Sequence, residues 1–160
     1  MKKQPFLACL VLFGVLVCGA SVCSAQASRI AGEWRGIWTN PAGSVFTAEI
    51  ILQEGSACKL CAGSGEGSIR GRIVWRLRKA GPNDTQALAA QAGATGTELV
   101  KGEMKGAGLL ILNGYQWEDT ALKSLDQYRL AISDNRQVIG GITLNGGSWT
   151  GQLIAVRPKQ

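Results

Sequence analysis

Glycines placed between large apolar residues at alternate positions are the feature that most constrains the fold of this chain. Residues 32–38 read Gly-Glu-Trp-Arg-Gly-Ile-Trp, so glycine or tryptophan occupies every second position. In an extended strand these positions share one face, and the tryptophans Trp34 and Trp38 indicate that this face meets a core. A glycine there costs stability, which indicates sharp bending of the strand or an aromatic ring packed on bare backbone.

The same arrangement recurs four times further along the chain. Each copy places one glycine among apolar residues of the same phase: Ile69-x-Gly71-x-Ile73-x-Trp75, Val100-x-Gly102-x-Met104, Val138-x-Gly140-x-Ile142 and Trp149-x-Gly151-x-Leu153. Repetition of this device predicts a β-sheet that is curved enough to close on itself.

Period-2 apolar patterns bounded by turn residues predict eight short strands. They cover residues 32–39, 44–53, 68–79, 97–104, 107–113, 127–133, 137–145 and 148–157. The connections include hairpin signals such as Asn145-Gly146-Gly147 and no crossover helix, so we predict an all-β, eight-stranded antiparallel up-and-down β-barrel. Pairing of the first strand with the last would leave no edge exposed. A two-sheet sandwich is the alternative.

In such a meander the connections alternate between the two ends of the barrel. Those at 40–43, 80–96, 114–126 and 145–147 share one end, and we expect any binding cavity to open there. An outer-membrane barrel is disfavoured, because the strand over 68–79 turns four arginines away from its apolar face.

The N-terminal residues predict a secretory signal peptide over residues 1–27. Lys2-Lys3 precede an apolar run over 6–17, and Ala25-Gln26-Ala27 supplies a cleavage site after Ala27. The run is shorter than the about 20 residues that span a bilayer, so no membrane span is expected. We therefore predict a periplasmic or secreted protein with one domain over 28–160. A lipoprotein signal is a weaker alternative, because valine precedes both Cys18 and Cys23.

Composition removes several classes of chemistry. The chain has no histidine, which excludes Ser-His and Cys-His nucleophile pairs and His-ligated metals. Loss of Lys2 and Lys3 leaves 15 of the 17 basic residues against 11 acidic ones, a charge of +4 that is too diffuse to indicate nucleic acid binding. We predict neither an enzyme nor a bound cofactor. Glu98 is the one acid in phase with Val100 and Gly102, and its place near a strand end predicts exposure to solvent.

Cys58 and Cys61 are the only cysteines after the predicted cleavage site. In an oxidising compartment they are expected to form a local disulfide that stiffens the loop around them. A redox or metal-binding role is the alternative, although neither a βαβ unit nor two further ligands are predicted beside them.

Two local patterns carry a resemblance to known families. Gly32-x-Trp34 at the start of the barrel, with Arg157 at its end, resembles the signature of lipocalins and related calycins, in which an arginine packs across the tryptophan of the first strand. This resemblance implies a calycin-like barrel in which Trp34 and Arg157 have a structural role.

Residues 36–46 resemble the first hairpin of the avidin family, whose pattern is Gly-x-Trp-x-Asn-x-x-Gly-Ser. In that family the asparagine and the serine bind the ureido group of biotin, so the resemblance implies these roles for Asn40 and Ser44. The tyrosine and serine of the third avidin strand fall at Ile73 and Trp75 here, so the biotin site is incomplete. A tight turn that favours Asn, Pro, Gly and Ser explains the same residues without a ligand.

The inner face of the predicted barrel carries Trp34, Trp38, Trp75 and Trp149. An interior of this size is either filled by side chains or holds one small ligand. We predict a non-catalytic binding protein for a small hydrophobic or ring-containing ligand, held among Trp38, Trp75 and Trp149 with Asn40 and Ser44 as polar anchors. The expected loop over 114–126 adds Tyr115 and Trp117 at the same end, as loop anchors or as a lid.

A protein-interaction module with a packed core is the alternative function. Arg70, Arg72, Arg76, Arg78 and Lys79 form a row on the outer face of one strand. Such a row is either a solvated surface or a docking patch for an envelope protein, peptidoglycan or anionic lipid headgroups. A periplasmic protease inhibitor is a further form of this alternative.

Overall fold

The computed structural model describes residues 30–54, 69–83, 90–106, 108–119, 125–145 and 148–159, without the side chains of residues 148 and 149. The predicted signal peptide over 1–27 and the predicted Cys58–Cys61 disulfide lie outside this part of the chain and stay predictions. The described residues contain no helix that is long and apolar enough to cross a membrane.

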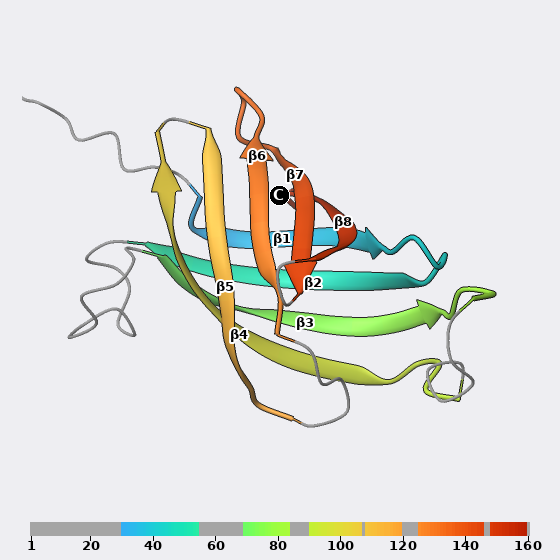
Figure 1. Cartoon of the computed structure of the whole chain (residues 1–160). Helices are drawn as coiled ribbons and strands as arrows, with labels where there is room; N and C mark the ends of the chain where they lie inside the picture. Colours follow the sequence, from blue (N-terminus) through green and yellow to red (C-terminus); the bar gives the residue numbers. More distant parts are fainter. Residues whose placement is uncertain are drawn as a thin grey trace, which may run out of the picture.

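Eight antiparallel strands close into a barrel in which each strand pairs with the next and the last pairs with the first. They are β1 (Gly32–Thr39), β2 (Val45–Glu54), β3 (Ile69–Lys79), β4 (Thr95–Lys105), β5 (Leu109–Trp117), β6 (Gln127–Ile132), β7 (Val138–Asn145) and β8 (Ser148–Val156). In Figure 1, β1 to β4 run across the view and β5 to β7 cross them steeply. The predicted barrel is confirmed, and the alternative sandwich is wrong.

The clearest difference from the predicted strands is in β5, which continues past Asn113 to Trp117. Tyr115 and Trp117 are therefore strand residues, and the prediction that they lie in a loop is wrong. The strand continues because β4 offers it partners over this stretch: Leu99 pairs with Gln116 and Glu98 pairs with Trp117. The backbone N–H of Glu118 still donates to the Thr97 carbonyl oxygen at 2.9 Å, so this pairing extends just beyond β5.

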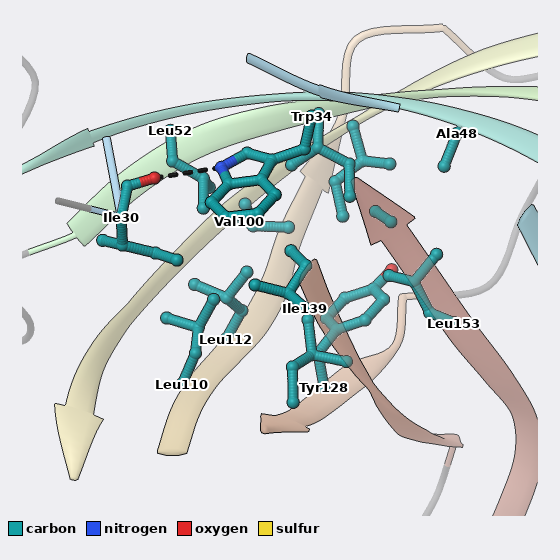
Figure 2. Packing of buried hydrophobic residues seen from close by; sticks show 14 of the residues in the cluster. Ile30, Trp34, Ala48, Leu52, Val100, Leu110, Leu112, Tyr128, Ile139 and Leu153 are labelled. Carbon is teal, nitrogen blue, oxygen red and sulfur yellow. Dashed lines mark hydrogen bonds between the residues drawn. The ribbon is translucent and has the colours of Figure 1, made fainter. Parts of the chain in front are cut away.

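Apolar side chains fill the middle of the barrel. Trp34 is fully buried, and its indole N–H donates to the Ile30 carbonyl oxygen at 3.0 Å. Figure 2 shows its ring beside Leu52 and Val100, with Tyr128 and Leu153 further along the interior. Other buried members of this cluster include Ile50, Ile69, Ile73, Leu110, Leu112, Leu130 and Ile139. Burial of this apolar surface is the main contribution to stability.

Trp34 and Arg157 close the end of the barrel at which the described chain begins. The Arg157 guanidinium carbon lies 4.2 Å from the centre of the Trp34 ring. Its Nη1 and Nε donate to the carbonyl oxygens of Ala31 at 3.1 Å and Arg136 at 3.0 Å. These contacts place the arginine across the first-strand tryptophan, as the calycin resemblance implies.

The inward phase of β7 differs from the prediction. Ile139 and Thr143 are buried, whereas Val138 and Ile142 are both 37% exposed. The prediction that Val138-x-Gly140-x-Ile142 faces the core is therefore wrong. Both faces of this strand carry apolar residues, so the period-2 pattern does not distinguish them, and the pairing with β6 and β8 decides which face points inward.

The glycines within the strands serve two purposes. A Cβ at Gly102 would lie 1.9 Å from the Ile111 carbonyl oxygen, so this glycine allows a neighbouring strand to approach in the bent sheet. A Cβ at Gly151 would lie 2.4 Å from the Trp38 ring, so here an indole packs on bare backbone. Both explanations offered by the sequence pattern therefore occur, at different glycines.

A methyl group at Gly102 should be costly, because its nearest neighbour is backbone that cannot rotate away. We expect Gly102→Ala to lower the free energy of unfolding by about 2 to 3 kcal/mol, measured by urea denaturation. Gly108→Ala is the matched control, because nothing lies within 4 Å of a Cβ there. Equal stability of the two variants would contradict this explanation of the glycine pattern.

Candidate functional site

Three irregularities of strand pairing gather toward one end of the barrel. The register of β2 against β3 shifts between Val45 and Phe46, and that of β4 against β5 shifts between Leu99 and Val100. The register of β7 against β8 shifts between Thr143 and Leu144. Such bulges are frequent at barrel rims and next to binding sites, because they change the direction of a side chain. We call this region the aromatic end and define it by the side chains of Trp38, Phe46, Trp75, Trp117 and Tyr128.

The bulge in β5 separates two aromatic residues that sequence alone placed together. Leu99 pairs with Gln116 and Val100 pairs with Gly114, so Tyr115 has no partner on β4. Tyr115 lies outside the barrel and is 37% exposed, with the Arg70 guanidinium carbon 5.6 Å from its ring centre.

Trp117 is directed the other way by the same bulge. It is partly buried, packs against the hydrophobic core and pairs with Glu98 of β4. Of the two aromatic residues predicted at the mouth, the structure places only Trp117 in the aromatic end.

Four rings of the aromatic end contact one another, three of them edge to face. The Trp38 ring centre lies 5.3 Å from that of Phe46 and 6.5 Å from that of Trp75. Trp75 in turn stacks on Tyr128 with an angle of 14° between the ring planes. Trp38 and Phe46 are only partly buried, so this cluster reaches from the core toward the surface.

Glu98 lies beneath these rings and is the polar centre of the aromatic end. It is 1% exposed, so the prediction that it faces solvent is wrong. Its Oε2 accepts hydrogen bonds from the indole N–H of Trp75 at 3.1 Å and from the Tyr128 hydroxyl. Its Oε1 accepts from the backbone N–H of Asp126 at 3.1 Å. The longer β4 and β5 enclose this carboxyl.

Gly114 provides the space that the Glu98 carboxyl occupies. A Cβ at this position would lie 1.8 Å from Glu98 Oε1. Gly114 is also the residue that precedes the unpaired Tyr115 in the bulge of β5. The bulge and the buried carboxyl are therefore linked through one glycine.

Burial changes the protonation of this carboxyl. Removal from water raises the pKa of Glu98 from 4.5 to about 7, against the opposing effect of its hydrogen bonds to Tyr128, Trp75 and the Asp126 backbone. Burial also raises the pKa of the Asp126 carboxyl, which accepts from Asn145 Nδ2 at 3.1 Å. Burial, with the nearby Glu98 charge, holds the pKa of Tyr128 well above its usual value. Near neutral pH, Glu98 is therefore protonated in part of the molecules, while Tyr128 keeps its proton.

Most N–H groups of the indole rings have a partner. Trp38 Nε1 donates to Thr143 Oγ1 at 2.8 Å, and Thr143 Oγ1 lies 3.1 Å from Thr150 Oγ1. Trp117 Nε1 differs, since it is buried and has no hydrogen-bond partner in the described part of the chain. A buried donor without an acceptor is uncommon in folded proteins.

Asn40 and Ser44 act within the connection between β1 and β2. Asn40 Oδ1 accepts from the backbone N–H of Ser44 at 2.8 Å, and Ser44 Oγ accepts from the backbone N–H of Gly81 at 3.1 Å. Ser44 is fully buried. These bonds favour the turn explanation of the Asn-Pro-Ala-Gly-Ser sequence over a role as polar anchors for a ligand. Trp149 pairs with Leu144 in the backbone register, and its side chain lies outside the described part.

Sequence reasoning did not select Tyr128, Asp126 and Thr143 as site residues. Tyr128 is in phase with the inward Leu130, which is the signal that could have found it. Glu98 was in phase with Val100, but its burial depended on the unrecognised length of β4 and β5. Within the described ranges, no group of three or more His, Cys, Asp or Glu side chains is placed to hold a metal ion.

Comparison with known proteins supports the fold. The chain is similar to two solved structures of redesigned β-barrels. For b11L5F_LGL the TM-score is 0.50 at 12% identity, covering 84% of this chain and 96% of that chain. For mFAP0 bound to DFHBI the TM-score is 0.50 at 16% identity, covering 80% of this chain and 98% of that chain. Neither protein-family models nor curated proteins gave a match. These similarities support a small closed barrel, without selecting the lipocalin or avidin family.

The raised pKa of Glu98 predicts a pH-dependent stability. Below about pH 4.5 the carboxyl is protonated in both the folded and the unfolded chain, so burial has no ionisation cost. Between about 4.5 and about 7 only the unfolded chain releases the proton, so stability falls as the pH rises, by about 3 kcal/mol in total. Glu98→Gln should remove this part of the pH dependence, measured by urea denaturation across the same range.

Glu118→Gln is the control, because it changes an exposed carboxylate at the same end of the barrel. Its pH profile should follow that of the unmodified protein. If Glu98→Gln also follows that profile, the buried carboxyl does not govern the pH dependence.

Proposed function

We propose that this protein binds a small ring-containing ligand at the aromatic end and does not catalyse a reaction. The observation that carries the proposal is the convergence of partly buried rings over a buried polar centre at one end only. Trp38, Phe46 and Trp117 are the partly buried rings, and Glu98 is the polar centre. Ligand sites combine apolar and aromatic walls with a few polar groups in this manner.

The other end of the barrel has the opposite character. The Trp34 ring is fully buried there, and Arg157 covers it with its guanidinium group. A ligand entering from that side would have to displace both the cation–π contact and two hydrogen bonds. The aromatic end is therefore the favoured point of entry.

The hydrogen bonds that Glu98 accepts favour a role in binding over a role in catalysis. Its carboxyl already accepts from Trp75, Tyr128 and the backbone of Asp126. A general base must reach the proton that it removes from a substrate, and this carboxyl is enclosed by the chain's own donors. Its role in the proposal is to hold the Trp75 and Tyr128 rings in place.

A designed barrel provides independent support. The redesigned β-barrel mFAP0, to which this chain is similar in fold, was solved bound to DFHBI. A small barrel of this kind can therefore hold a small molecule. Together with the predicted signal peptide, these arguments favour a periplasmic or secreted binding protein.

Binding should depend on the inward rings and not on the outward one. We expect anilinonaphthalene sulfonate to bind with an increase in its own fluorescence and quenching of tryptophan fluorescence. Trp38→Leu removes a ring that contacts both Phe46 and Trp75, so affinity should fall about tenfold or more. Tyr115→Leu is the matched control, since this ring lies outside the barrel, and should leave affinity unchanged.

Native mass spectrometry of protein isolated from its own host gives a second measurement. A bound small molecule that is lost from the Trp38→Leu variant is expected. Flat fluorescence together with no bound species would contradict the proposed function, as would equal loss of binding in the two variants.

A second candidate function is docking to an anionic lipid surface through the outer face of β3. Arg72, Arg76 and Arg78 are exposed, and the described residues show no ion pair for any of them. Each such cation near an anionic bilayer contributes about 1 kcal/mol to binding. Unneutralised positive charge along one strand is the specific observation that favours this function.

Charge reversal tests this candidate. We expect the double variant Arg72→Glu, Arg76→Glu to lose most of its binding to phosphatidylglycerol vesicles in a sedimentation assay. Arg129→Glu, an exposed change on β6, is the control and should have a much smaller effect. Absence of vesicle binding by the unmodified protein, or equal losses in both variants, would rule the candidate out.

A further inference from the structure

An apolar patch lies on the outer face of the barrel, over β7, β8 and β1. Ile154 of β8 is 58% exposed and Ile37 of β1 is 54% exposed, and the backbone register places them side by side. The same register places the exposed Val138 of β7 beside Val156 of β8, and Ile142 is a further exposed member. Five Val and Ile side chains at these exposures present roughly 400 Å² of apolar surface, a size at which the largest patch of a protein is often functional. We call these five residues the outer patch.

The described chain leaves the outer patch uncovered. Its members, the flanking strands β6 and β2, and the connection over 133–137 all lie in the described part. Residues 146–147 join β7 and β8 beyond the pair Asn145–Ser148, at the end of these strands that is away from Val138 and Val156.

Gly140 forms a recess in the middle of the outer patch. It pairs with Ile154 of β8, and a Cβ at Gly140 would first meet Ile154 Cγ1 at 3.5 Å, an ordinary van der Waals distance. Gly141 beside it differs, because a Cβ there would lie 2.0 Å from the Arg129 carbonyl oxygen. A glycine within a strand lowers stability and often marks a close approach by another group. Since the chain itself leaves room for a side chain at Gly140, the approach is expected from outside.

A two-fold axis between Gly140 and Ile154 makes the outer patch complementary to itself. Each Ile154 side chain then enters the Gly140 recess of the other copy, so that one contact is formed twice. The same axis sets Val156 of one copy against Val138 of the other. The most exposed side chain therefore meets the recess, and apolar residues meet apolar residues.

The border of the outer patch carries charges of opposite sign on its two sides. Arg35 lies beside Val156 on β1, and Asp134 lies in the connection from β6 to β7, whose Ser133 N–H donates to the Val138 carbonyl oxygen. Arg35 and Asp134 are exposed, and neither has an ion pair among the described residues. The same two-fold axis brings Arg35 of each copy to the side of the other copy that carries Asp134.

We propose that the outer patch binds a second copy of this chain in a two-fold symmetric dimer. A stable interface buries about 800 Å² on each partner, with an apolar centre and a polar border, and the outer patch with its border is of this order. Glu33 and Glu49 lie beside Arg35 on the outer face and disfavour an anionic membrane as the occupant. The patch is on the side of the barrel, so the dimer leaves the aromatic end of each copy open and does not depend on the proposed ligand.

Sedimentation velocity of protein produced from the whole sequence tests the dimer. We expect a dimer at about 100 µM that dissociates on dilution. Gly140→Thr fills the recess, so it should raise the Kd about tenfold or more while the circular dichroism spectrum is retained, because a Cβ fits at this position. Gly108→Thr is the matched control and should leave the Kd unchanged, because it lies outside the patch with nothing within 4 Å of a Cβ.

Ile154→Asp is a second variant, which places a charge at the centre of the interface. It should be monomeric at the concentration at which the unmodified protein is a dimer, because an unpaired charge is costly to bury. Leu109→Asp changes a partly exposed residue of β5 outside the patch and should remain dimeric.

A mixture of two charge variants tests the facing of Arg35 and Asp134. Arg35→Glu and Asp134→Arg should each weaken the dimer, because like charges then face one another between identical copies. An equal mixture should form a heterodimer in which both facing pairs again have opposite sign. We expect this heterodimer to be about fivefold tighter than either homodimer.

The outcomes distinguish the second copy from other occupants. A monomer at about 100 µM, equal effects of Gly140→Thr and Gly108→Thr, or no recovery in the mixture would overturn the inference. A monomer that is destabilised by Ile154→Asp and not by Leu109→Asp would assign the patch to residues 1–29 of its own chain. A monomer that sediments with phosphatidylglycerol vesicles through Ile154 would assign it to a membrane instead.

Discussion

Hydrogen bonding between β1 and β8 is the constraint on which the rest of the structure depends. It joins the first strand to the last, so no strand edge is left free and the sheet surrounds the interior around its whole circumference. Closure requires strong bending, and Gly102 meets this need where a neighbouring carbonyl group approaches too closely for a side chain. At Gly151 the absent side chain instead makes room for the Trp38 ring, which connects closure of the barrel to construction of the aromatic end.

The two ends of the barrel use aromatic residues differently. At one end the buried Trp34 donates to backbone and is covered by Arg157, so its hydrogen-bonding and stacking capacity is used within the protein. At the other end Trp75 and Tyr128 surround a carboxyl, and their N–H and O–H groups converge on it. The first arrangement closes the barrel, and the second fixes the rings in place around a polar centre.

The buried Glu98 has an energetic consequence for the site. Its ionised form is stabilised by three hydrogen bonds but destabilised more strongly by removal from water, which leaves its pKa near neutrality. An apolar residue at this position would avoid the ionisation cost, but it would leave the Trp75 N–H and the Tyr128 hydroxyl without an acceptor. The free-energy cost of ionising Glu98 is therefore linked to the positioning of the Trp75 and Tyr128 rings at the candidate site. Carboxyl groups with shifted pKa values are often found at functional sites.

The sequence by itself determined the strands and much of the interior, because period 2 and turn residues are local signals. The bounds of β1 and the inward phase of Ile73 and Trp75 are examples. Only the tertiary structure decided the burial of Glu98, the opposite directions of Tyr115 and Trp117, and the outward phase of Val138 and Ile142. Each of these depends on register and bulges between paired strands, and a single inserted residue reverses the phase of every residue beyond it.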